Sequence, residues 1–103
     1  MIILVGDTRK TDFLRDIKRL GWGRMVTTKT PKPYPGEPWG FDNGAFAAWV
    51  NKRPFPADEF QRRLDKAYQI GIPYLAVCPD IVAAGNKSLD FSLKWLEKLP
   101  ADW

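Results

Sequence analysis

Residues 39–46 of the chain are Trp39-Gly40-Phe41-Asp42-Asn43-Gly44-Ala45-Phe46. A short apolar run ends at Asp42, a glycine follows two residues later, and the apolar segment that comes next has the composition of a helix. A carboxylate at the end of a strand, with tight backbone beyond it, is how an α/β protein presents a catalytic or ligand-binding acid. The stretch therefore predicts a strand over residues 39–42, a helix over residues 45–50, and a candidate catalytic acid, Asp42, between them.

A second acid, Asp80, ends the apolar run over residues 74–80 in the same way. Because the carboxyl ends of parallel strands open on one side of a sheet, we expect Asp42 and Asp80 to face the same mouth. Two carboxylates there can divide acid and base roles, or accept hydrogen bonds from the amide edge of a purine. The alternative for each acid alone is a helix cap or an Asx-type loop contact. The matched pair favours a functional site.

Three neighbours of Asp42 complete the predicted substrate-binding set with Asp80. Asn43 offers an amide donor and acceptor, and Gly44 leaves its backbone N–H open to a ligand. Phe46 can stack on a planar ring, although a core position under the helix is the simpler alternative.

The rest of the chain alternates between strand-like and helix-like patterns. The predicted strands cover residues 2–5, 25–28, 39–42 and 74–78. The predicted helices are one capped by Thr11 and ended by Gly21, two over residues 45–50 and 57–70, and a last one capped by Ser88. The apolar run over residues 74–78 predicts a strand covered on both faces. Residues 30–38 form a proline-rich loop, either a stiff wall beside the site or a plain crossover.

Alternating strands and helices predict an α/β fold with a parallel sheet. Four strands make a thin sheet, and the last helix has a wide apolar face that four strands leave unused. A (β/α)8 TIM-type barrel has eight strands, so we expect residues 1–103 to form a single partial domain, the amino-terminal half of such a barrel with about four βα units.

Composition excludes several kinds of chemistry. The chain has no histidine, which excludes Ser-His-Asp or Cys-His activation and histidine-based metal sites. Its one cysteine, Cys78, fits a reducing compartment, and we expect it to behave as a small hydrophobe. A net charge of +4 permits nucleic-acid binding but favours it only weakly. Without a signal sequence or a membrane-spanning run, we expect a cytoplasmic protein, with no membrane contact, metal or cofactor.

These motifs resemble the tRNA-guanine transglycosylase superfamily. The segment at residues 41–46 is similar to its Asp-Ser-Gly-Gly-Phe motif, and residues 76–83 resemble its next acid-bearing strand. With residues 23–25 and 35–40, the pattern is closest to the branch that inserts 7-deazaguanines into DNA in phages and bacteria. The resemblance covers nearly all of this chain but only the amino-terminal half of the family domain.

The resemblance implies a (β/α)8 barrel that exchanges guanine for a 7-deazapurine in DNA or tRNA, through a covalent intermediate on an aspartate nucleophile. By position, Asp42 matches the acid that helps bind the base and move protons, and Asp80 matches the acid that reads the base edge. The nucleophile and zinc ligands of the family belong to its second half. Asn43 replaces the family's serine, and Ala45 follows Gly44 where the family has a second glycine, so the resemblance does not extend to the detailed base contacts at these positions.

We therefore expect weak or no catalysis from this chain alone, and a need for a carboxy-terminal half or for self-association. The alternative is a small non-catalytic α/β module of a phage or mobile element. Such a module would bind its partner through an aromatic surface made of Trp22, Trp39, Trp95 and Trp103.

Overall fold

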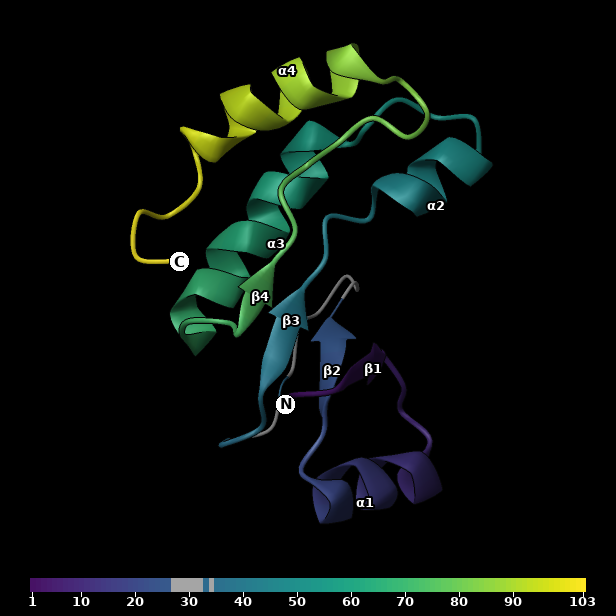
Figure 1. Ribbon diagram of the computed structural model, residues 1–103, viewed down its shortest axis with the longest axis vertical. Coiled ribbons are helices and arrows are strands. Elements are labelled where there is room, and N and C mark those ends of the chain that lie inside the picture. Colours follow the sequence, from purple (N-terminus) through teal and green to yellow (C-terminus); the bar gives the residue numbers. More distant parts are fainter. Residues whose placement is uncertain (27–32, 34) are drawn as a thin grey trace.

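The computed structural model describes residues 1–26, 33 and 35–103 (Figure 1). Within them lie four strands, β1 (Leu4–Gly6), β2 (Gly23–Val26), β3 (Trp39–Phe41) and β4 (Leu75–Ala76). They form one sheet in the order β1-β2-β3-β4, and every neighbouring pair is parallel. The predicted α/β fold with a parallel sheet is confirmed. Residues 27 and 28 of the predicted strand and residues 30–32 and 34 of the predicted proline-rich loop lie outside the described residues.

Four helices accompany the strands: α1 (Thr11–Leu20), α2 (Ala45–Val50), α3 (Ala57–Ile70) and α4 (Asn86–Leu96). The bounds of α2 and α3 are those predicted. Gly21 ends α1 in the left-handed region, with φ of 70° and its N–H directed to the carbonyls of Ile17 and Lys18. Figure 1 shows α3 beside β3 and β4, with α4 beyond it and α1 at the opposite end of the molecule.

Both predicted helix caps are wrong. Thr11 is the first residue of α1 rather than its cap, and no side chain caps this helix end. Ser88 lies inside α4, which begins two residues earlier, at Asn86. Its hydroxyl instead accepts a hydrogen bond of 3.0 Å from the backbone N–H of Ile81, so it fastens the loop before the helix.

The core lies between α3, α4 and one face of the sheet. Phe60 is fully buried, and its ring meets that of Trp95 edge-on at 5.2 Å between centroids. The last residue, Trp103, packs its ring 5.5 Å from that of Phe41. The buried cluster is Val26, Trp39, Phe41, Phe60, Leu64, Ala67 and Trp95. Trp39 and Trp95 therefore belong to the core, and an aromatic surface that includes them is ruled out.

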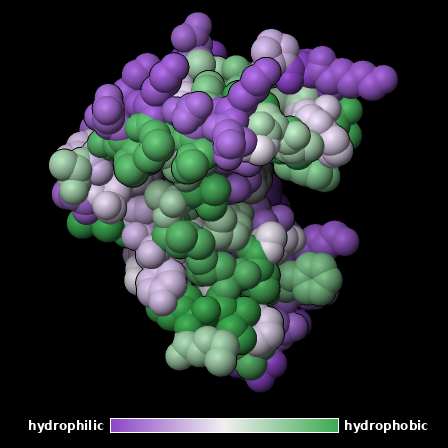
Figure 2. All heavy atoms as spheres, turned by 45° about the horizontal axis from the view of Figure 1, so that its top comes forward, coloured by the Kyte–Doolittle hydropathy of each residue, from purple (hydrophilic) through white to green (hydrophobic). Residues whose placement is uncertain are grey.

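The strand β4 is shorter and more exposed than predicted. Tyr74 is 64% exposed and Leu75 is 48% exposed, so the expectation of a strand covered on both faces is wrong. The register explains the difference. Leu75 stands opposite Gly40, and by alternation both point to the face that α3 does not cover. Figure 2 shows a band of apolar surface on one side of the molecule, with hydrophilic side chains gathered along its upper edge.

Candidate functional site

The loops after β3 and β4 bring the two predicted acids to the same end of the sheet. The N–H of Asp42 donates to the carbonyl of Val26 at 3.0 Å, and the N–H of Val77 donates to Phe41 at 2.8 Å. The ladders thus continue one residue beyond the assigned strands. Asp42 and Asp80 both follow these ends and are partly buried.

Asn43 joins the two loops. Its side chain is only 3% exposed. The amide nitrogen donates to the carbonyl of Cys78 at 2.8 Å and to Oδ1 of Asp80 at 2.6 Å. Its Oδ1 accepts the N–H of Ala45 at 2.7 Å, at the start of α2. The amide is engaged at both ends by protein groups, so Asn43 ties the loop after β3 to the loop after β4 and orients Asp80.

Gly44 occupies a position that favours glycine. Its φ is 75°, in the left-handed region, and an added Cβ would lie 3.2 Å from Nη2 of Arg63. Its N–H, which we expected to be open to a ligand, donates to Oδ2 of Asp42 at 3.3 Å. This is the Asx-type contact that was the alternative for Asp42, and it leaves Oδ1 of that carboxylate for other partners.

Arg63 on α3 also contacts the loop after β3. This residue was not identified from the sequence. It is 8% exposed on α3, and its Nη2 lies 3.4 Å from the carbonyl oxygen of Asn43. Its position relative to Phe60, Leu64 and Ala67 places it on the buried face of α3, a spacing that could have identified it.

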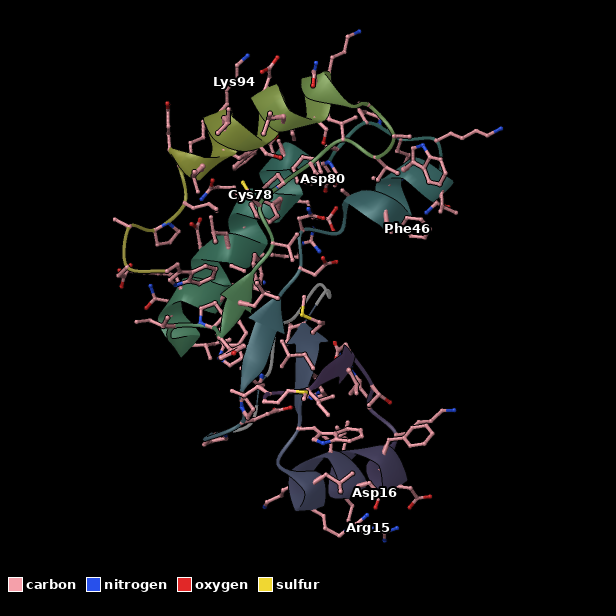
Figure 3. All side chains as sticks on the ribbon, in the orientation of Figure 1. Arg15, Asp16, Phe46, Cys78, Asp80 and Lys94 are labelled. Carbon is pink, nitrogen blue, oxygen red and sulfur yellow. The ribbon has the colours of Figure 1, made fainter. Side chains whose placement is uncertain are left out.

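Phe46 lies apart from the acids. It is 65% exposed, so a core position under α2 is wrong. Its ring lies 5.7 Å from that of Trp49. Figure 3 shows Phe46 on α2 and Asp80 in the loop after β4, both beyond the carboxyl ends of the strands and separated from one another. A stacking role for Phe46 stays a prediction.

Cys78 is held in the same loop cluster. Its thiol donates to the carbonyl of Ser92 at 3.1 Å, and the hydroxyl of Ser92 donates to the carbonyl of Pro79 at 2.7 Å. Burial raises the pKa of the Cys78 thiol, and the nearby charge of Asp80 raises it further. A raised pKa keeps the thiol protonated, in line with the small hydrophobe predicted.

We expect alkylation of Cys78 by iodoacetamide to require a more alkaline pH in the native chain than in urea, because only the thiolate reacts and folding raises its pKa. Rates measured against pH give both midpoints. Asp80→Asn should lower the native midpoint only in part, since burial is the larger cause. A native midpoint at or below that of the unfolded chain would contradict this assignment.

A second polar cluster surrounds Arg24 on β2. Arg24 is 5% exposed and contacts Oδ1 of Asp7 at 3.1 Å. It also forms a two-pronged pair with Glu37, at 2.8 Å from Nε and 3.1 Å from Nη2. Asp7, which follows β1, is therefore paired with the buried guanidinium group of Arg24. The pair with Glu37 anchors the segment that leads into β3.

Two hollows in the described part of the surface lie away from the two acids. They measure about 570 and 810 Å³ and lie beside α1, and neither is lined by Asp42 or Asp80. Across residues 1–26, 33 and 35–103, no three Cys, Asp or Glu side chains gather as metal ligands. None of the helices in this part of the chain has both the length and the apolar character needed to cross a bilayer.

The fold and the site define a parallel α/β protein with two acids at the carboxyl ends of neighbouring strands. No protein-family model, curated protein or solved structure matches the chain.

Proposed function

We propose that this chain forms one wall of a purine-base pocket in a transglycosylase-like enzyme that exchanges guanine for a 7-deazaguanine in DNA or tRNA. The observation that carries the proposal is the placement of Asp42 and Asp80 after adjacent parallel strands, linked through the 2.6 Å bond from Asn43 to Asp80. Asp80 accepts N–H groups of the base edge. Asp42 helps hold the base and moves a proton during exchange.

The strand order supports one half of a (β/α)8 barrel. A doubly wound sheet reverses its strand order at a switch point, whereas a barrel adds each strand beside the last. The order β1-β2-β3-β4 follows the second pattern. By alternation, Leu4, Met25 and Leu75 share the face that α3 leaves open, and in a barrel this face is the packed interior. Another segment or a second copy would supply the remaining strands and the nucleophile.

The orientation of the two acids supports this role. Asp42 alternates onto the same face as Gly40, which is the open face of the sheet. Its Oδ2 accepts the N–H of Gly44, and this bond fixes the direction of the carboxylate. The amide of Asn43 fixes Asp80 in the same way. Two carboxylates held in fixed directions at one end of the sheet suit the donor edge of a guanine-type base, whose ring N–H and amino group both need acceptors.

Free-base binding tests this function. We expect the chain to bind 7-deazaguanine in preference to adenine by calorimetry, because only the former presents two adjacent donors to the acids. Asp80→Asn and Asp42→Asn should each weaken binding about tenfold, since each removes a charged acceptor worth about 1.5 kcal/mol. The matched control is Asp90→Asn, an exposed acid on α4. Equal affinity for the two bases, or equal loss in the control, would refute the base pocket.

The second candidate, a non-catalytic partner-binding module, is favoured by one observation. Large apolar side chains remain exposed on α2 and along β4, including Trp49 at 51% and Leu75 at 48%. Under this candidate they contact a protein partner, and the base-binding experiment separates the two functions because a module of this kind has no preference between bases.

A further inference from the structure

Two exposed aromatic rings stand together on α2. Phe46 is 65% exposed and Trp49 is 51% exposed. Their ring centroids are 5.7 Å apart, with the planes inclined at 39°. A single exposed aromatic side chain is common on protein surfaces, but these two are neighbours on one turn of helix. Together they offer adjacent flat surfaces to a ligand that stacks.

Two cationic residues come shortly after the same helix in the sequence. Lys52 and Arg53 are both exposed. The N–H of Lys52 donates to Trp49 at 3.0 Å, and the N–H of Arg53 donates to Ala48 at 2.9 Å, so the turn folds back onto α2. The chain has no acidic residue between Asn43 and Ala57, and the charge of this segment is therefore uniformly positive.

We propose that Phe46, Trp49, Lys52 and Arg53 form a docking platform for a single-stranded or locally unpaired stretch of nucleic acid. Bases stack on the two rings, and phosphates lie against the two cations, which is how sequence-tolerant single-strand sites bind. This platform would be the nucleic-acid-binding surface of the proposed enzyme, and its assignment rests on that proposed function. The two adjacent cations, with no acidic residue between Asn43 and Ala57, favour a polyanionic partner.

The position of the platform supports this partner. The helix α2 begins immediately after Gly44, and the acid-bearing loop precedes it directly. Figure 3 shows Phe46 and Asp80 at the same end of the molecule, beyond the carboxyl ends of the strands. A nucleic-acid strand held on α2 would therefore lie at the end of the molecule where the acids are.

The test uses a labelled oligothymidine of about 12 nucleotides, within the size range of single-strand sites. It contains no purine, so its binding cannot come from the base pocket. By fluorescence anisotropy, the double variant Phe46→Ala with Trp49→Ala should bind at least tenfold more weakly than the wild type. The single variant Trp49→Phe should keep most of the wild-type affinity, because phenylalanine also stacks. The matched control is Phe13→Ala, a 55% exposed aromatic residue on α1, which should bind as the wild type does.

The cations are tested by salt dependence. Lys52→Glu with Arg53→Glu should reduce the slope of log affinity against log salt by about 1.4, since each contact on a single strand contributes about 0.7. Lys18→Glu with Arg19→Glu makes the same charge change on α1 and should leave that slope unchanged.

The other possible results of these measurements reject either the platform or the proposed base exchange. No oligothymidine binding by the wild type, or unchanged binding after loss of both rings, overturns the platform. If the ring variants instead abolish a concentration-dependent increase in solution mass, the rings form a protein contact and the platform is also overturned. Oligothymidine binding without selective binding of free 7-deazaguanine rejects the proposed base exchange and leaves the platform standing.

Discussion

Asn43→Leu is expected to lower the free energy of unfolding by about 3 kcal/mol. Leucine has the branched four-atom side-chain skeleton of asparagine but removes every polar atom from a site that is 3% exposed. The carbonyl of Cys78, the N–H of Ala45 and the Asp80 carboxylate each lose a partner at 2.6–2.8 Å. Urea unfolding of the variant and the wild type measures the difference.

Asn43→Asp is expected to make the stability of the chain depend on pH through the same contact. The variant keeps an acceptor for the N–H of Ala45 but sets a second carboxylate against Asp80, where the amide nitrogen now stands at 2.6 Å. Repulsion raises the folded-state pKa of the pair above the value of about 3.9 in the unfolded chain. The variant is therefore close to the wild type below about pH 4, and it loses stability as the pH rises from the pKa of the unfolded chain to the raised pKa of the folded pair. Urea midpoints compared at pH 4 and pH 7 show this.

Asn51 supplies the matched control for both variants. It is exposed at the end of α2, and its amide donates to the carbonyl of Ala47 at 2.8 Å without touching an acid. Asn51→Leu should cost about 0.5 kcal/mol, and Asn51→Asp should show no comparable change with pH. If the Asn43 and Asn51 substitutions changed the free energy of unfolding equally, the hydrogen bonds that link the two loops would make no particular contribution to stability.

Gly23→Ala is expected to destabilise the chain by about 3 kcal/mol, for a steric reason. A Cβ at Gly23 would overlap the backbone carbonyl of Pro38 and press on Leu4 at 2.9 Å. A backbone carbonyl cannot rotate away as a flexible side chain does, so β2 or the segment before β3 must shift. Thermal unfolding followed by circular dichroism measures the loss.

Gly6→Ala is the control for this position. Gly6 lies on the neighbouring strand β1, opposite Met25, and an added Cβ meets nothing within 4 Å. We expect the Gly6 variant to unfold within about 0.5 kcal/mol of the wild type. Equal stability of the two variants would mean that the close approach of Pro38 to β2 is absent in solution.

The sequence was sufficient for the features that depend on local pattern. The helices at 45–50 and 57–70 were predicted to the residue, because apolar spacing and flanking glycine or proline define them. The parallel sheet and the placement of both acids at strand ends followed from the alternation of elements.

The features that depend on neighbours in space were missed. Nothing in the apolar run at 74–78 shows that one face of β4 lacks a cover, so its exposure had to come from the sheet register. Arg63 has the side chain of a surface residue, and its contact with the loop after β3 is made to a residue 20 positions away in the sequence. Trp49 is a large apolar residue, yet it is 51% exposed on α2.

The confinement of Asn43 also governs the chemical ageing of this protein. Asn43 precedes Gly44, and an asparagine followed by glycine is prone to deamidation, in which the next backbone nitrogen attacks the side-chain carbonyl carbon. In the native fold that nitrogen directs its hydrogen to Asp42, and the Asn43 amide is buried and bound at both ends. The folded chain is thereby protected, whereas an unfolded one deamidates to aspartate or isoaspartate. Aspartate at this position is the pH-sensitive variant, so each episode of unfolding leaves a fraction of molecules that refold less well at neutral pH.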